Sequence, residues 1–164
     1  METTLNAIRS KGPCSEGWKK LLTNLGKTAA DDEPLSLITI LDSNGLDDAL
    51  WCLRAVTGHD KEIRLFAVWC ARQVQHLMKD PRSINALDVA ERFANGDATK
   101  EELEAAFAEA WAAANSEANA AAKPEVRGAT WSAARAASNY VAHSVAWAKG
   151  LAAQEDKFRE LISG

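Results

Sequence analysis

The 164-residue sequence contains no long apolar run: nowhere do about 18 apolar residues follow one another without a charge. The first residues, METTLNAIRSKG, hold no apolar stretch of signal length either. We therefore expect a cytoplasmic protein that neither crosses a membrane nor is exported. Cysteines are few and odd in number, and two of the three, Cys52 and Cys70, fall within apolar helical patterns. This placement predicts buried, reduced thiols.

Motifs that bind nucleotides or carry a serine nucleophile are missing, because the chain has no G-x-S-x-G, no P-loop and no G-x-G-x-x-G. His59, His76 and His143 are scattered, without a Cys, His or carboxylate pair at zinc-site spacing. A thiol nucleophile is disfavoured, because Cys52 and Cys70 occupy core positions, where an apolar setting makes a thiol inert. The sequence therefore predicts no enzyme, no catalytic residue, no metal site and no cofactor.

Positive charge is too sparse for a nucleic-acid platform. The formal net charge is -4; residues 1–80 carry ten Lys/Arg against eleven Asp/Glu, and residues 81–164 carry nine against twelve. The density of acidic residues is also too low to imitate DNA, which has one negative charge per about 1.7 Å of helix axis. The paired acids fall where helices are expected to begin, and the positive helix end accounts for them there. We expect no direct nucleic-acid partner.

No strand-like alternation of convincing length occurs, so the predicted fold class is all-α. The stretch Asp60–Met78 is the only apolar segment long enough for the middle of a small domain, and its apolar residues recur every three and four positions. Leu65, Val68 and Trp69 add a second apolar face, which predicts neighbours on two sides. We predict a compact bundle of about 6–8 helices with this long central helix and a long C-terminal helix.

Residues that stop or cap helices mark the expected boundaries. Gly26 and the pair Asn44-Gly45 are typical carboxyl-terminal stops, and Pro34 fits the first turn of a helix. Thr99 and Glu102 match a capping box, in which each side chain bonds the other residue's amide. The helices expected from these signals cover 15–25, 34–44, 46–56, 60–78, a segment ending at Asn95, 100–122 and 126–162.

The composition changes after residue 99. Residues 100–122 and 126–162 are rich in alanine, with Trp111, Trp131 and Trp147 set among small residues. Low-complexity disorder is the alternative, but alanine favours helices and tryptophan calls for burial, so we predict an ordered helical pair. The expected single domain, 1–164, then comprises a variable N-terminal extension (1–30), core helices (35–98) and this Ala/Trp-rich pair (99–162).

The last expected helix carries a bulky stripe of Tyr140, Trp147, Leu151 and Phe158. The stripe could be partly exposed and serve as a docking surface. The favoured interpretation is that it packs against another core helix. Tryptophan is enriched at binding hot spots, and six tryptophans are more than a core of this size requires. The residues predicted to contact a partner are Tyr140, Trp147 and Phe158, with Glu101, Glu104 and Glu109 on a neighbouring polar face.

Three blocks follow one another along the chain: NGLDDALWCLRAV, EIRLFAVWCARQVQHLM and DPRSINALDVAERFANGDATKEELEAAFAEAW. In this order, and with the alanine/tryptophan-rich tail, they resemble a family of helical immunity proteins encoded in bacterial and phage genomes. The resemblance spans about residues 35–162. It implies binding to a toxin or other effector and blocking it without catalysis, and it transfers no catalytic residue.

Three hypotheses follow from the sequence. The favoured one is a non-enzymatic inhibitor that binds a toxin or a host defence protein stoichiometrically, as immunity proteins or phage anti-defence proteins do. The second is a self-assembling structural protein whose bulky stripe is buried between copies, with a homodimer as its simplest form. The third is an enzyme without a recognisable motif, which would need a deep pocket lined by His or Cys.

Overall fold

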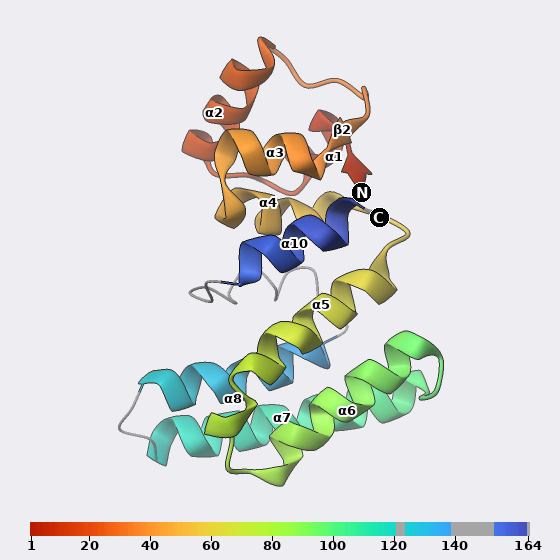
Figure 1. Cartoon of the computed structure of the whole chain (residues 1–164), viewed down its shortest axis with the longest axis vertical. Coiled ribbons are helices and arrows are strands. Elements are labelled where there is room, and N and C mark those ends of the chain that lie inside the picture. Colours follow the sequence, from red (N-terminus) through yellow and green to blue (C-terminus); the bar gives the residue numbers. More distant parts are fainter. Residues whose placement is uncertain (121–123, 139–152, 164) are drawn as a thin grey trace. The chain divides into compact units, whose positions relative to one another are not determined.

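The structure is a computed structural model that describes residues 1–120, 124–138 and 153–163. Over these residues the chain is all-α, as predicted, apart from one two-stranded ribbon (Figure 1). The elements are β1 (Glu2–Thr3), α1 (Leu5–Ser10), α2 (Ser15–Leu25), β2 (Leu35–Ser36), α3 (Leu37–Asn44), α4 (Leu46–Cys52), the 3-10 turn η1 (Leu53–Ala55), α5 (Asp60–Gln73), the 3-10 turn η2 (Gln75–Leu77), α6 (Pro81–Asn95), α7 (Lys100–Ala120), α8 (Pro124–Ala136) and α10 (Gln154–Ser163).

The described elements group into two compact units. Unit 1 combines Met1–His59 with the C-terminal helix α10, and unit 2 runs from α5 to α8. The expected division into an extension, core helices and a C-terminal pair differs from this grouping, because α10 belongs with the first 59 residues. The single domain expected from the sequence stays a prediction.

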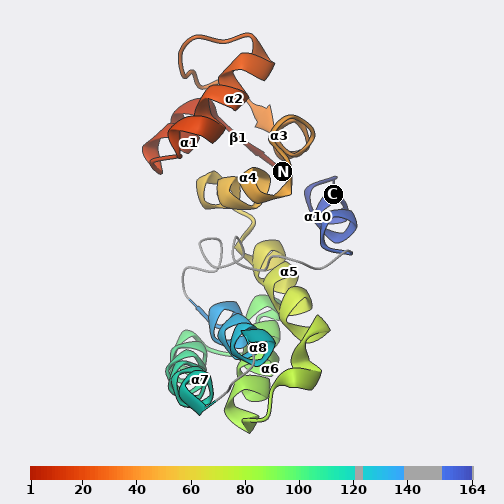
Figure 2. The ribbon, with the colours of Figure 1, turned by 90° about the vertical axis from the view of Figure 1, so that its left-hand side faces the viewer.

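In unit 1 the first residues are part of the core. β1 pairs antiparallel with β2, with Thr3 opposite Leu35, and the Thr3 hydroxyl donates a hydrogen bond to the carbonyl of Ala55 at 2.7 Å. Leu5 and Ile8 of α1 are buried. α10 lies beside α3 in both views (Figures 1 and 2).

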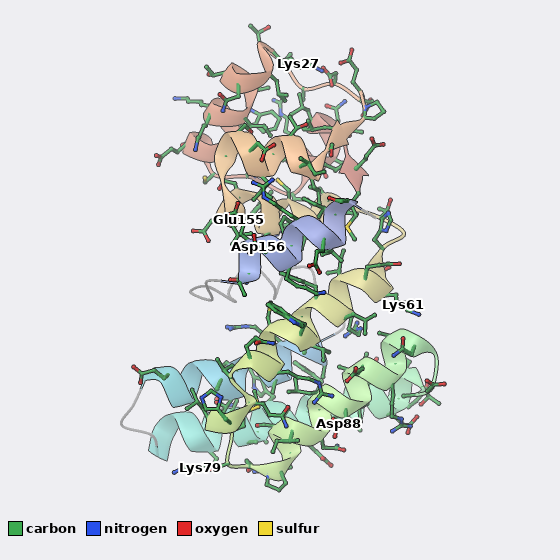
Figure 3. All side chains as sticks on the ribbon, in the orientation of Figure 1. Lys27, Lys61, Lys79, Asp88, Glu155 and Asp156 are labelled. Atoms are coloured by element: carbon green, nitrogen blue, oxygen red, sulfur yellow. The ribbon has the colours of Figure 1, made fainter. Side chains whose placement is uncertain are left out.

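Two polar contacts fix α10 within unit 1. The Met1 ammonium donates to the carbonyl of Ile162 at 2.7 Å, and an Arg159 Nη1 donates to Asp42 Oδ1 of α3 at 2.9 Å. Glu155 and Asp156 lie in the first turn of α10, where negative charge meets the positive helix end (Figure 3). The N-terminus and the C-terminal helix α10 therefore belong to one folded unit.

The third helix begins later than predicted. Pro34 lies before it, Leu35 and Ser36 pair as β2, and the Ser36 hydroxyl accepts a hydrogen bond from the Ile38 amide at 3.2 Å as the N-cap of α3. The pairing with β1 draws the backbone into an extended conformation that local sequence signals do not reveal. The next helix also stops early, at Cys52, and continues as the tighter turn η1.

Unit 2 contains the segment expected to form the long central helix, but α5 ends at Gln73 and not at Met78. The chain leaves the α conformation at Val74 (φ -113°, ψ 10°), tightens into η2 and becomes extended at Met78. Asp80 then caps α6 by accepting a hydrogen bond from the Arg82 amide at 2.9 Å. The unit packs α6, α7 and α8 together with α5 (Figure 2).

The prediction of one long, continuous C-terminal helix over 126–162 is wrong. α8 ends at Ala136, and the chain is in a turn at Ala137 and outside any helix at Ser138. Because this segment is interrupted, the described residues hold nine α-helices, against the expected 6–8. None of the helices in the described ranges is both long and apolar enough to span a bilayer.

Several boundaries are confirmed. α2 covers Ser15–Leu25 and is closed by Gly26 at φ 65°, and α3 ends at Asn44 as predicted. The capping box before α7 is present in both directions: Thr99 N donates to Glu102 Oε2 at 2.7 Å, and Glu102 N donates to Thr99 Oγ1 at 3.2 Å.

Candidate binding surface

An exposed aromatic cluster joins α7 and α8 in unit 2. Among the described residues, Trp111 is the one large apolar side chain that is exposed, with 45% of its surface accessible. Its ring meets Trp131 of α8 edge to face, with centroids 4.5 Å apart and planes at 82°. Phe107, one turn earlier on α7, lies 5.7 Å from Trp111. These distances and angles are favourable for aromatic pairs, so the three rings hold one another in place.

Small residues explain why Trp111 lies at the surface. α7 buries Leu103 and the alanine stripe Ala106, Ala110, Ala113 and Ala114, which lets α6 and α8 approach closely. The two bulky residues of the same helix, Phe107 and Trp111, lie four positions apart at the edge of that stripe. The alanines form the interface of α7 with α6 and α8, and the rings of Phe107 and Trp111 lie at the edge of that interface.

Arg135 supports the cluster from α8. Its guanidinium carbon lies 6.0 Å from the centre of the Trp131 ring, at the outer limit of a cation–π contact. Burial lowers the pKa of Arg135 from its usual range, although an arginine remains charged at neutral pH. Trp131 thus contacts Trp111 edge to face and also has a partly buried cation near its ring.

The acidic residues of α7 differ in their relation to Trp111. At 3.6 residues per turn, Glu104 lies roughly 20° from Trp111 around the helix, Glu101 roughly 80° and Glu109 roughly 160°. All three are exposed. Hydrogen bonds from its own backbone amide and from Thr99 lower the pKa of Glu101, which keeps that carboxyl ionised. We call Phe107, Trp111 and Trp131, with Glu101 and Glu104, the α7 aromatic surface.

The residues predicted for partner contact have different positions in the structure. Glu101 and Glu104 join the α7 aromatic surface, whereas Glu109 points to another side of the helix. Tyr140 and Trp147 lie outside the described residues. Phe158 has none of its surface exposed and belongs to the core of unit 1, so its predicted contact role is wrong and its core interpretation is confirmed.

Trp111 itself was not predicted as a contact. The sequence interpretation required burial of the tryptophans in the alanine-rich segments, and for Trp111 that expectation is wrong. The signal that could have found it is the spacing of Phe107, Trp111 and Glu104 on one side of a helix, beside a stripe of alanines. Alanines bury little area, but they allow close packing that leaves no room for an indole.

The thiols are placed as the sequence predicted. Cys52 and Cys70 are buried thiols, and Cys14 is an exposed thiol. Burial, followed by the nearby Asp48 carboxylate, raises the pKa of Cys52 to about 12, so that this thiol is neutral at physiological pH. Over the described ranges, no group of three His, Cys, Asp or Glu side chains could hold a metal ion.

Comparison of the chain with protein-family models, with curated proteins and with solved structures finds no match. The resemblance to helical immunity proteins therefore stays a prediction. The α7 aromatic surface is what the described part of the chain itself offers for recognition. Its chemistry is an exposed indole supported by two further rings, with acidic residues two to three turns earlier on α7.

Proposed function

We propose that this protein binds another protein stoichiometrically and thereby neutralises it, the partner being a toxin or a defence effector. The observation that carries the proposal is Trp111, exposed to 45% and held by Trp131 and Phe107. Tryptophan is among the residues most enriched at binding hot spots. Truncation of a hot-spot side chain to alanine typically costs about 2–4 kcal/mol of binding free energy. A ring that is already fixed loses little conformational entropy on binding.

The surface also indicates the chemistry of the partner. Glu104 lies on the same side of α7 as Trp111, two turns earlier, with Lys100 Nζ 3.6 Å from its Oε1, and Glu101 is ionised in the first turn of the helix. A complementary partner surface has an apolar pocket that accepts an indole, with lysine or arginine on the side that faces these acids. Such charge pairing favours the correct partner and raises the association rate, and it weakens as salt is added.

Self-association through the same surface is the second candidate, because an exposed indole could pack against its counterpart in another copy. A two-fold contact would place the same patch on both sides. Glu101 and Glu104 of the two copies would then approach one another, and like charges across an interface are unfavourable. Multi-angle light scattering over a range of concentrations decides the matter: a constant monomer mass rules out self-assembly, and a mass that rises to a dimer supports it.

The test of the proposed function begins with affinity capture from a lysate of the native host, using the wild-type protein and the Trp111→Ala variant. The captured partner is then purified, and its own activity is measured while the wild-type protein is added. Stoichiometric neutralisation predicts a linear loss of that activity that ends at one equivalent. A partner that is bound but keeps its full activity would contradict the inhibitor function.

Matched variants on one helix locate the surface. Trp111→Ala and Glu104→Gln should weaken capture, whereas Glu109→Gln, an equally exposed acid on another side of α7, should leave it unchanged. Circular dichroism first confirms that each variant is folded. Equal capture by all three variants would show that recognition takes place elsewhere on the chain.

A further inference from the structure

Unit 1 contains a cavity of about 90 Å³ between α1, α2, α3 and α4. A cavity needs roughly 10–15 Å³ to hold one water, so this one has room for several heavy atoms of a ligand. The cavity is partly open to solvent, and the exposed residue Cys14 forms part of its wall. It is lined by Ile8, Pro13, Cys14, Gly17, Trp18, Leu21, Ile40, Asn44, Asp48, Trp51 and Cys52.

The walls are mainly apolar and include two tryptophans, Trp18 of α2 and Trp51 of α4. Trp51 is held in place by Arg54, whose guanidinium carbon lies 4.5 Å from the ring centre. The Cys52 thiol is neutral at physiological pH, because burial and the neighbouring Asp48 raise its pKa to about 12. Cys52 and the apolar residues therefore give the cavity no charge.

Asp48 is the one charged residue in the cavity wall. Its Oδ2 accepts a hydrogen bond from Asn44 Nδ2 at 2.8 Å, and the same amide group donates to the carbonyl of Gly17 at 2.9 Å. These bonds fix the carboxylate against α2, where Gly17 has no side chain: a Cβ there would lie 2.7 Å from Asp48 Oδ2. The acid is therefore positioned by three elements, α2, α3 and α4.

The Asp48 carboxylate has no positive partner within the described part of the chain. The nearby Lys20 bonds instead to the carbonyl of Asn44, with its Nζ at 3.1 Å, and no salt bridge to Asp48 is formed. A half-buried negative charge beside apolar walls gains free energy from a cation that reaches it. The cavity thus combines one uncompensated carboxylate with two indoles.

We propose that this cavity binds a small organic cation with an apolar body, of the methylated ammonium class. The indoles of Trp18 and Trp51 would contact the methyl groups, as aromatic side chains do in sites for quaternary ammonium ligands, and Asp48 would supply the opposite charge. The site lies wholly in unit 1, and it does not depend on the α7 aromatic surface or on the function proposed for it.

Choline is the probe, and its uncharged carbon isostere, in which a tert-butyl group replaces the trimethylammonium, is the matched control ligand. Both have the same shape, so the difference between them measures the contribution of charge. Titration calorimetry should show that choline binds about tenfold more tightly than the isostere, in keeping with cation–π and carboxylate contacts. Nuclear magnetic resonance should show shifts of the indole N–H signals of Trp18 and Trp51 when choline is added.

Variants test the residues. Asp48→Asn keeps the shape of the side chain and should remove the preference for choline while leaving binding of the isostere unchanged. Asp47→Asn alters the adjacent acid, which does not line the cavity, and should behave as wild type. Trp18→Leu should weaken binding of choline, and thermal unfolding verifies that each variant is folded.

Three results would overturn the proposal. Equal binding of choline and the isostere would show an apolar pocket without selectivity for charge. Absence of binding of either ligand at millimolar concentration would show a packing cavity only. An unchanged preference for choline in Asp48→Asn would place the cation elsewhere.

Discussion

Arg64 of α5 closes the carboxyl end of α8: its Nη1 donates a hydrogen bond to the carbonyl oxygen of Ala136 at 2.8 Å, and a second one to that of Ser138 at 2.9 Å. The side chain is 95% buried, and its guanidinium carbon lies 5.2 Å from the ring centre of Phe93. Burial lowers the pKa of Arg64, and the nearby Asp60 opposes that shift. A cation at a helix carboxyl end complements the negative end of the helix dipole, so Arg64 ties α8 to α5.

Arg64→Met should destabilise unit 2 by about 2–4 kcal/mol, because it leaves two helix-end carbonyls without their charged donor. The matched control is Arg92→Met, which removes an exposed arginine that also bonds a carbonyl beyond a helix end, that of Asp97 at 3.0 Å. An exposed arginine should cost about 1 kcal/mol or less. Urea unfolding followed by circular dichroism measures both. Equal losses in the two variants would contradict the role assigned to Arg64.

Phe158 and Trp111 should give opposite results when each is changed to alanine. Phe158 is fully buried in unit 1, so Phe158→Ala should lower the free energy of unfolding by about 3–5 kcal/mol. Trp111 is exposed on unit 2, so Trp111→Ala should cost about 1 kcal/mol, mainly through its lost contact with Trp131. Thermal and urea unfolding of the two variants measure these losses. A loss of several kcal/mol of unfolding free energy in Trp111→Ala would show that this ring belongs to the core.

Alkaline pH should destabilise the protein through Cys52. The folded-state pKa of this thiol is about 12, above the ordinary value of 9.0, so between these values the unfolded chain loses a proton that the folded chain keeps. Stability is then lost as pH rises above 9, by up to about 1.4 kcal/mol per pH unit from this group. Urea unfolding from pH 8 to 11 should therefore show a steeper decline for wild type than for Cys52→Ala. Parallel curves would contradict a buried, protonated thiol.

Gly17 and Asp48 should be energetically coupled. A methyl group at position 17 would lie 2.7 Å from Asp48 Oδ2 and displace a carboxylate that Asn44 holds. Gly17→Ala should therefore destabilise the wild-type protein by about 1–2 kcal/mol. In an Asp48→Ala background the same change should be neutral or stabilising by about 0.5–1 kcal/mol, because alanine favours a helix over glycine. The double-mutant cycle measures the coupling, and an equal cost in both backgrounds would contradict it.

The sequence predicted local features better than the association of elements. The end of α2 at Gly26, the end of α3 at Asn44 and the capping box of Thr99 and Glu102 depend on neighbouring residues only, and all are confirmed. The start of α3 was misplaced, because Leu35 pairs with Thr3, 32 positions away. Pairing between residues so far apart in the sequence cannot be predicted from the helix and strand propensities of neighbouring residues.

The candidate surface was predicted only in part for a related reason. The sequence places Glu101, Glu104 and Glu109 on a polar face of the helix, and all three are exposed, since acids on an amphipathic helix face water. Burial is expected for Trp111 because a tryptophan set among alanines is typical of a helix that packs its large side chain into the core. Its exposure follows from the close packing of the alanines of α7 against α6 and α8, which becomes visible only when the helices are in place.

The most direct test of the proposed function is titration calorimetry of the purified, captured partner into three proteins: wild type, Trp111→Ala and Glu109→Gln. We predict one-to-one binding by wild type, an affinity lower by about thirtyfold or more for Trp111→Ala, and an unchanged affinity for Glu109→Gln. Identical affinities for all three proteins would contradict the claim that the α7 aromatic surface is the binding site.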